Sequence, residues 1–208
     1  MTLMDKLSVD MNNDVKRKLE ILKERLIKLY YDNLVKINHS VMELICTKSL
    51  IIRGYNVDVE RILDIDFVCD IFAIKGEGVL IIEVETGYTP PDHALDPSRY
   101  KEARIASKIA RYSSYANKFA LATPLYNTLQ IPKIFSKPPR NRSNREVIKV
   151  KKSCDVYYSN PPIEVQQIKE AHLQSIYIID VDKALTREMD PEAYQEMVST
   201  IESISKLG

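Results

Sequence analysis

The most regular hydrophobic pattern lies near the N-terminus, where apolar residues recur every three or four positions between residues 13 and 31. This period predicts an amphipathic helix that begins with Asn13 or Asp14 as its N-cap. The spacing fits a coiled-coil seam between two copies of the chain, and it fits equally a single helix packed on the domain's own core. Both alternatives stay open, because fewer than three heptads are present. The apolar positions are Val15, Leu19, Leu22, Leu26 and Leu29.

A second helix is predicted over residues 40–53, and Gly54 suits its C-terminal stop. Ser40 and Glu43 stand three residues apart, which is the spacing of a capping box at a helix N-terminus. Capping is therefore the structural explanation for Glu43, to be weighed against a role in a functional site. Residues 55–63 then alternate between apolar and polar side chains, and this period predicts a half-buried strand.

The next stretch predicts a β-hairpin, because two apolar runs, residues 67–74 and 79–86, flank a glycine-containing turn. With the turn centred between residues 76 and 77, cross-strand partners have residue numbers that sum to 153. Asp70 then lies directly opposite Glu83. Side chains alternate between the faces of a strand, so Glu85 joins Glu83 on the same face.

Three carboxylates, those of Asp70, Glu83 and Glu85, thus converge within two strands that are otherwise nearly all apolar. Like charges opposite each other destabilise a sheet, and a buried unpaired carboxylate is costly. On an exposed sheet face each of these residues would simply be solvated or paired with Lys or Arg. The three together favour a metal site, and hard oxygen ligands suit Mg²⁺ or Mn²⁺.

The remaining pattern completes an α/β fold with a mixed central sheet flanked by helices. A proline-containing loop at residues 88–97 precedes the rest, and Asp190 and Pro191 form the N-cap and first turn of the last helix. We expect an N-terminal helical extension over residues 1–38 and a domain over residues 39–208. The other predicted elements are a helix from 97 or 98 to 117, a strand at 118–123, a basic proline-rich insertion at 132–162 with a short helix near 145–152, and a strand at 175–181.

The composition is that of an ordinary globular protein and does not indicate a particular function. The chain has 208 residues, of which 45% are hydrophobic and 28% are charged, as in ordinary globular domains. No apolar run is long enough to cross a membrane and the N-terminus lacks the apolar region of a signal peptide, so a cytoplasmic protein without membrane contact is expected. The three cysteines and three histidines are scattered and indicate neither a disulfide framework nor a zinc site.

The net charge of +1 hides an uneven distribution. Residues 133–152 carry a local charge of +7, and the rest of the chain carries −6. Such a basic segment predicts contacts with a phosphate backbone. The candidate nucleic-acid-binding residues in it are Arg140, Arg142, Arg145, Lys149, Lys151 and Lys152.

The helix that follows the hairpin adds a second basic stripe, because Lys101, Arg104, Lys108 and Arg111 recur at helical spacing. By base rate this stripe is a solvated face. Its position directly after the carboxylate strand keeps a role in a site open, and Arg104 and Arg111 are further candidates for nucleic-acid contact. Tyr112, Tyr115 and Tyr126 could stack on bases, although core packing is the commoner role.

The helix with Glu43, the hairpin with Asp70 and then Glu83-x-Glu85, and the helix–strand crossover resemble the core of the PD-(D/E)xK nuclease superfamily. Within it, archaeal Holliday-junction resolvases and restriction-endonuclease-like proteins are the most similar, over residues 40–123. The resemblance implies a restriction-endonuclease-like core and Mg²⁺ or Mn²⁺ bound by Asp70 and Glu83. Glu43 is implied as an outer or second-metal ligand, and Glu85 as a further candidate ligand and catalytic residue.

The chain departs from that family's motif at two positions. Cys69 stands in place of a loosely kept proline, and Glu85 replaces the motif lysine. In this superfamily the lysine can migrate to the following helix. That implies Lys108 as the catalytic cation, with Lys101 next.

The resemblance implies a metal-dependent endonuclease that hydrolyses DNA, with branched or structured DNA among its substrates. If no cation fills the lysine role, the alternative is a catalytically degenerate protein that binds nucleic acid or a protein partner without cleavage. A metal-dependent hydrolase of nucleotides is a third alternative, and the extended basic segment argues against it. A homodimer is expected if the N-terminal heptads pair.

Overall fold

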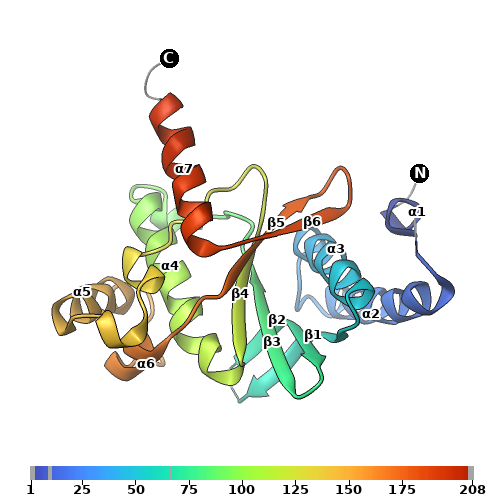
Figure 1. Ribbon diagram of the computed structural model, residues 1–208, viewed down its shortest axis with the longest axis horizontal. Coiled ribbons are helices and arrows are strands. Elements are labelled where there is room, and N and C mark those ends of the chain that lie inside the picture. The colour runs from blue at the N-terminus through green and yellow to red at the C-terminus, as the bar shows by residue number, and fades with distance from the viewer. Residues whose placement is uncertain (1–2, 9–10, 66, 206–208) are drawn as a thin grey trace.

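The structure is a computed structural model that describes residues 3–8, 11–65 and 67–205, and it shows a six-stranded mixed sheet with helices on both faces (Figure 1). The strands are β1 (Asn56–Asp64), β2 (Phe67–Lys75), β3 (Gly78–Val84), β4 (Lys118–Pro124), β5 (Ser175–Asp180) and β6 (Leu185–Met189). The α-helices are α1 (Leu3–Ser8), α2 (Asn13–Tyr31), α3 (Ile37–Ile52), α4 (Pro97–Tyr112), α5 (Asn144–Asp155), α6 (Val165–Glu170) and α7 (Pro191–Ser205). Short 3₁₀ turns occur at Pro91–His93, Ser113–Tyr115, Lys133–Ser136 and Pro139–Asn141.

The strands lie side by side in sequence order, from β1 to β6. β1, β2 and β3 form an antiparallel meander, β3, β4 and β5 run parallel, and β6 returns antiparallel to β5. α4 makes the crossover between β3 and β4, as a parallel pair requires. The predicted α/β class with a mixed sheet between helices is confirmed. The sequence pattern does not predict β6, because this short edge strand is mostly polar and its side chains are largely exposed.

The hairpin has the predicted register. Ile71 pairs with Ile82 and Lys75 with Gly78, so partner numbers sum to 153 along the ladder. Gly76 has a φ of +61°, a left-handed conformation that glycine adopts without strain in the turn. The polar–apolar pattern was therefore sufficient to place the two strands correctly against each other.

The helices divide into two layers. α2 and α3 lie on one face of the sheet, and α4, α5 and α6 lie on the other (Figure 1). α4 approaches the sheet closely because Ala103, Ala106 and Ala110 form its buried face. Each layer has its own buried apolar cluster, which the sheet separates. Among the described residues, no helix has both the length and the apolar character needed to cross a membrane.

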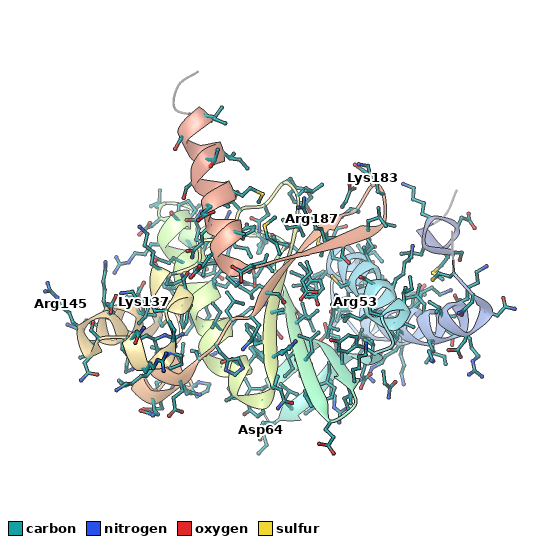
Figure 2. All side chains as sticks on the ribbon, in the orientation of Figure 1. Arg53, Asp64, Lys137, Arg145, Lys183 and Arg187 are labelled. Atoms are coloured by element: carbon teal, nitrogen blue, oxygen red, sulfur yellow. The ribbon has the colours of Figure 1, made fainter. Side chains whose placement is uncertain are left out.

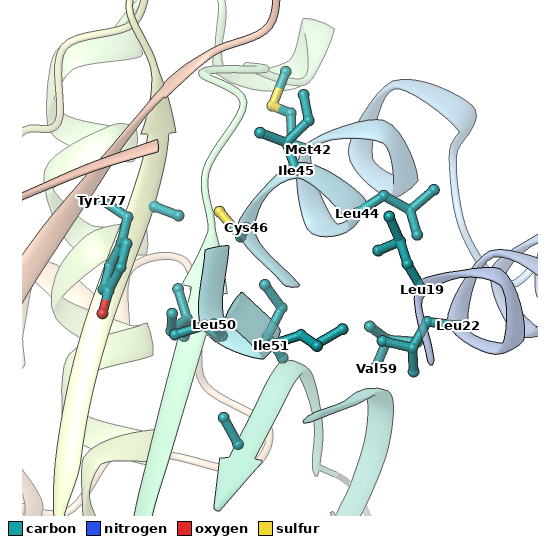
Figure 3. Close-up of a cluster of buried hydrophobic side chains, with 14 of the residues drawn as sticks. Leu19, Leu22, Met42, Leu44, Ile45, Cys46, Leu50, Ile51, Val59 and Tyr177 are labelled. Atoms are coloured by element: carbon teal, nitrogen blue, oxygen red, sulfur yellow. The ribbon is translucent and has the colours of Figure 1, made fainter. Parts of the chain in front are cut away.

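The apolar stripe of α2 packs on the chain's own core. Leu19 and Leu22 lie against Leu44 of α3 and Val59 of β1 (Figure 3). Of the two alternatives for the heptad pattern, the structure therefore shows the single amphipathic helix, and the stripe is not an open seam. The helix spans Asn13–Tyr31 as predicted, but its N-cap is Asn12 and not Asn13 or Asp14, because the Asn12 side chain accepts a hydrogen bond from the Val15 N–H at 2.9 Å.

α3 corrects the predicted capping box. The helix begins at Ile37, with Lys36 as an N-cap that makes no side-chain cap bond, so Ser40 and Glu43 lie inside the helix and not at its start. Both side chains are buried, and neither has a hydrogen bond among the described residues. The S-x-x-E spacing is present, but the helix is a turn longer than the pattern suggested. Capping therefore does not explain Glu43.

Arg142 corrects a second prediction, since it is buried and cannot contact nucleic acid. Its guanidinium donates hydrogen bonds to five backbone carbonyls at 2.6–3.1 Å. It thereby joins the 3₁₀ turn at Lys133–Ser136 to the C-terminal end of α6 and fixes the shape of the insertion. The accepting carbonyls belong to Ile134, Lys137, Ile168, Lys169 and Ala171.

Replacing Arg142 with alanine should destabilise the protein by about 3 kcal/mol or more, because buried carbonyls would lose charge-assisted hydrogen bonds. Arg140→Ala, at an exposed neighbouring position, is the matched control and should change the free energy of unfolding by less than about 0.5 kcal/mol. Urea denaturation measures both. Equal midpoints for the two variants would show that the five bonds do not hold the insertion.

Candidate metal centre and acidic cluster

Carboxylates occupy equivalent places on three neighbouring strands. Val59 pairs with Ile71 and Arg61 with Cys69, so Glu60 of β1 lies opposite Asp70 of β2. On the other side of β2, the register of the hairpin places Asp70 opposite Glu83 of β3. Glu60, Asp70 and Glu83 therefore form a row across the sheet.

The carboxylates replace part of the backbone ladder where β2 and β3 meet the row. The Asp70 N–H donates to Glu83 Oε1 at 3.2 Å, and the Val84 N–H donates to Asp70 Oδ2 at 2.6 Å. These bonds lie beyond Ile71–Ile82, the last backbone pair of the hairpin at this end. The two side chains thus hold the strands together at the point where regular pairing stops.

The row also interrupts the alternation of faces. Glu60 has a φ of +48°, which is unusual for a residue other than glycine within a strand. Cys69 and Ile71, two residues apart, belong to the apolar clusters on opposite faces of the sheet. Because of this local twist, Asp70 contacts side chains from both helical layers.

On the α4 side, the Lys108 ammonium lies among three carboxylates. Its Nζ is 2.8 Å from Glu85 Oε1, 3.0 Å from Glu83 Oε2 and 3.6 Å from Asp70 Oδ2. The Arg104 Nε donates to both oxygens of Glu85 at 3.0 Å. We call Asp70, Glu83, Glu85, Lys108 and Arg104 the lysine cluster.

The pKa values in the lysine cluster follow from burial and from Lys108. Burial and the nearby Asp70 carboxylate raise the pKa of Glu83 to about 8. Burial also opposes ionisation of Asp70 and Glu85, but the pKa of each is lowered, because Lys108 acts together with His39 on Asp70 and together with Arg104 on Glu85. Near neutral pH, two carboxylates therefore face two cations, Lys108 and Arg104, and Glu83 can hold a proton.

On the α3 side, Asp70 belongs to a second group with His39, Glu43 and Glu60, which we call the histidine cluster. His39 Nε2 lies 3.2 Å from Asp70 Oδ1 and 3.5 Å from Glu43 Oε1. One possible ligand atom from each of the four residues lies within 4.8 Å of the others. Helix spacing explains the α3 pair, because His39 and Glu43 are four residues apart and share one face.

The histidine cluster holds more acid than the described residues neutralise. Burial and the carboxylates of Asp70 and Glu60 raise the pKa of Glu43 well above its ordinary value. Burial and Asp70 likewise raise the pKa of Glu60. Burial disfavours charged His39, but the Asp70 carboxylate outweighs this and raises the pKa of the imidazole.

A divalent cation fits the histidine cluster. Both oxygens of Glu43 are buried without a hydrogen bond among the described residues, and buried carboxylates of this kind are stabilised by coordination. Three carboxylates with one imidazole suit Mn²⁺, and the carboxylates alone suit Mg²⁺. The Mg²⁺ or Mn²⁺ expected from the sequence thus has a donor set, but a different one from Asp70, Glu83, Glu43 and Glu85. In the structure, Lys108 lies where Asp70, Glu83 and Glu85 converge.

The predicted site residues of the hairpin and of α4 are only partly brought together. Asp70, Glu83, Glu85 and Lys108 meet directly. Lys101 lines a small cavity with Glu85 and Arg104, but the ion pairs of Glu85 within the described residues are those with Lys108 and Arg104.

The sequence pattern missed His39 and Glu60. His39 was one of three scattered histidines, and its spacing of four from Glu43 was the available signal. Glu60 needed the pairing of β1 with β2, in which it faces Asp70. The first signal lies within α3 alone, whereas the second needs two strands to be paired.

Apart from Arg111 on α4, the remaining basic candidates lie on α5 or just before it. α5 packs against α4 through Cys154, whose Sγ lies 3.7 Å from the Ala103 carbonyl oxygen. Arg145 projects from α5 away from the sheet (Figure 2). Arg111 donates to the Pro161 carbonyl at 2.6 Å, and Lys151 pairs with Asp155 at 2.8 Å. A groove of about 670 Å³ between α4 and α5 is lined by four cations, Arg99, Lys133, Lys149 and Lys152, and by Glu102 and Glu146.

Comparisons of the chain with protein-family models, with curated proteins and with solved structures give no match. The resemblance to PD-(D/E)xK nucleases and the restriction-endonuclease-like core therefore stay predictions. They depend on Glu43, Asp70 and Glu83 and on the order of the elements that carry them.

Lys108→Met should destabilise the protein by about 3 kcal/mol at neutral pH, because the variant leaves Asp70 and Glu85 buried without their main cation. Adding Glu85→Gln should recover part of the loss. Lys101→Met, on the same helix, is the control and should have little effect. Chemical denaturation of the four proteins measures these differences.

The loss in Lys108→Met should shrink as the pH falls. Lowered carboxylate pKa values stabilise the wild-type fold above the unfolded pKa values of about 4, and that contribution disappears as the pH drops through the folded values. In the variant, burial instead favours protonated carboxyl groups in the folded state. A stability difference that stays constant between about pH 7 and about pH 4 would show that Lys108 does not neutralise these groups.

Proposed function

We propose that this protein is a metal-dependent endonuclease that hydrolyses phosphodiester bonds in DNA. The observation that carries the proposal is the position of Asp70, which contacts the histidine cluster through Oδ1 and the lysine cluster through Oδ2. A divalent-cation site and a pair of cationic side chains thereby share one carboxylate. Phosphodiester hydrolysis requires both a metal and stabilisation of charge on the phosphate.

A divalent cation, when held by His39, Glu43, Glu60 and Asp70, supplies Lewis-acid activation of the phosphate and lowers the pKa of a water molecule. The chain's own residues supply the rest. Arg104 lines the same cleft as Glu60 and Asp70, so its guanidinium can contact a phosphate oxygen there. Arg104 is therefore the cation of the lysine cluster that can contact the substrate in the proposal.

Lys108 acts in this proposal as a positioning residue. It is more buried than Arg104, and it fixes Asp70 and Glu85 at distances of 3.6 and 2.8 Å. Glu85 in turn orients Arg104 through two hydrogen bonds. Glu83, with a pKa of about 8, can exchange a proton near neutral pH, but it is buried behind Lys108 and acts through it.

A second candidate function is nucleic-acid or partner binding without cleavage. It is favoured by the charge balance of the lysine cluster, where two cations already neutralise two carboxylates. Binding of Mn²⁺ distinguishes the two candidates, because a degenerate site has no need of the ion. In isothermal titration, Mn²⁺ binding that Glu43→Gln and Asp70→Asn abolish supports the hydrolase.

DNA, a homodimer and a cytoplasmic location stay part of the proposal. DNA as substrate is supported by the exposed cations of α5. The dimer can no longer use the stripe of α2, because α3 and β1 cover it, so a dimer would need another surface.

Asp70→Asn should lower metal-dependent cleavage by at least roughly 100-fold, the scale for removing one group of a preorganised electrostatic site. The assay uses labelled linear, supercoiled and four-way-junction DNA with Mg²⁺, Mn²⁺ or EDTA. Asp92→Asn, an exposed acid outside both clusters, is the control and should cut like the wild type. Binding of DNA should change little in either variant.

Three results of this assay would count against the endonuclease. Cutting that persists in EDTA would show that no metal is needed. Cutting that persists in Asp70→Asn would show that the shared carboxylate is not needed. Binding without cutting under every condition, together with no Mn²⁺ binding, would establish the second candidate function.

Neutralising Arg145, Lys149 and Lys152 together should flatten the salt dependence of DNA binding. Each lost phosphate contact lowers the slope of log K against log salt by about 0.7–0.9, so the triple Gln variant should lose up to about 3. Lys183→Gln with Arg187→Gln, on the β5–β6 hairpin (Figure 2), is the control. An unchanged slope would place α5 outside the interface.

A further inference from the structure

Glu60 and Asp70 of the acidic row form part of the wall of a cleft of about 1400 Å³. Its volume exceeds the usual range for small-molecule pockets, about 300–1,000 Å³. His39, Glu60 and Asp70 line it together with Arg104. The cleft therefore leads directly to the candidate metal centre, and it is large enough to take part of a polymer.

Four tyrosines line this cleft from separate parts of the chain. Tyr30 and Tyr31 end α2, Tyr88 follows β3, and Tyr126 follows β4. Tyr31, Tyr88 and Tyr126 are 77%, 65% and 75% exposed. Core packing therefore does not account for these rings, and three distant segments bring them to one place.

The segments that carry Tyr88 and Tyr126 are fixed to each other. Asn127 Nδ2 donates to the Glu85 carbonyl at 3.2 Å and to Thr123 Oγ1 at 2.9 Å. Gly87 has a φ of +83°, and a Cβ there would lie 2.2 Å from Asn127 Oδ1. The close contact of Gly87 with Asn127 places the two tyrosines, each one residue away, on a preorganised wall.

The charges of the cleft do not suit an intact duplex. Its lining has two permanent cations, Lys36 and Arg104, against the carboxylates of Glu60 and Asp70. Tight duplex binding needs a row of cations along the backbone. Aromatic rings instead bind bases by stacking, which requires that the bases be unpaired and is tolerant of sequence.

We infer that the cleft binds a nucleic-acid strand with unpaired bases, stacked on Tyr88, Tyr126 and the tyrosines at the end of α2. A phosphate of the same strand then lies against Arg104 and the histidine cluster. The substrate is a single strand, or the unpaired part of a branched or frayed structure. That this strand is also cut rests on the proposed function.

The test compares a fluorescein-labelled single strand with the same strand paired in a blunt duplex, by fluorescence anisotropy in EDTA. The single strand should bind at least roughly tenfold more tightly, since only its bases can stack. Tyr88→Ala and Tyr126→Ala should each weaken single-strand binding by roughly 5- to 150-fold, the range for losing one stacked base. Tyr88→Phe and Tyr126→Phe, which keep the ring face, should bind like the wild type.

Tyr115→Ala is the matched control, because this partly exposed tyrosine contacts Phe67 and Asp64 and is outside the lining of the cleft. It should not change binding. Equal affinity for duplex and single strand would overturn the inference, and so would Ala variants of Tyr88 and Tyr126 that bind like Tyr115→Ala. The comparison of single strand with duplex on the wild-type protein keeps the test decisive if an Ala variant does not fold.

Cleavage then separates the inference from the function on which it rests. Tyrosine-dependent single-strand binding, without cutting in Mg²⁺ or Mn²⁺, supports the cleft as a binding site and overturns the endonuclease. Metal-dependent cutting of duplex and single strand at equal rates, insensitive to Tyr88→Ala and Tyr126→Ala, supports the endonuclease and overturns the inference.

Discussion

The ammonium group of Lys108 is the contact on which the functional end of the sheet depends. Three carboxylates from β2, β3 and the residue after β3 converge there, and like charges at this distance would force the strands apart. Lys108 removes this repulsion from the α4 side. It thereby couples the position of a helix to the end of a hairpin that pairs through side chains instead of backbone. The close packing allowed by the alanines of α4 is what brings the ammonium within reach.

Asp70 connects the charges neutralised by Lys108 to the other face of the sheet. Its second oxygen faces His39 and the buried Glu43, where acid is in excess and coordination by a cation would relieve it. The left-handed backbone at Glu60 marks the local cost of bringing one carboxylate into contact with both layers. A strained residue beside excess buried charge is typical of a functional site and unusual in a purely structural core. This contrast is the physical ground for treating the row as a site.

Features that depend on residues close in the sequence could be predicted, and features that depend on tertiary packing could not. Hairpin register depends on adjacent residues and a turn, so the pairing of Asp70 with Glu83 could be predicted. Helical spacing made Lys108 a candidate site residue. Glu60 and His39 could not be predicted in the same way, because their meeting depends on how β1 and α3 pack on β2. The prediction that Arg142 binds nucleic acid was wrong because of its own environment. Its charge suggested solvent, but five carbonyls from two distant turns solvate it inside the protein.

The place of α4 between the acidic row and the groove of α5 sets a length scale. A helix with its side chains is about 10–12 Å thick, and successive phosphates on a strand advance about 3.4 Å along a duplex axis. A strand that keeps this stacked spacing and reaches from the groove cations to Arg104 therefore covers about three nucleotides on the way around the helix. Dinucleotides are too short to engage both places at once. The thickness of one helix thus fixes a minimum footprint for any nucleic acid that uses the whole surface.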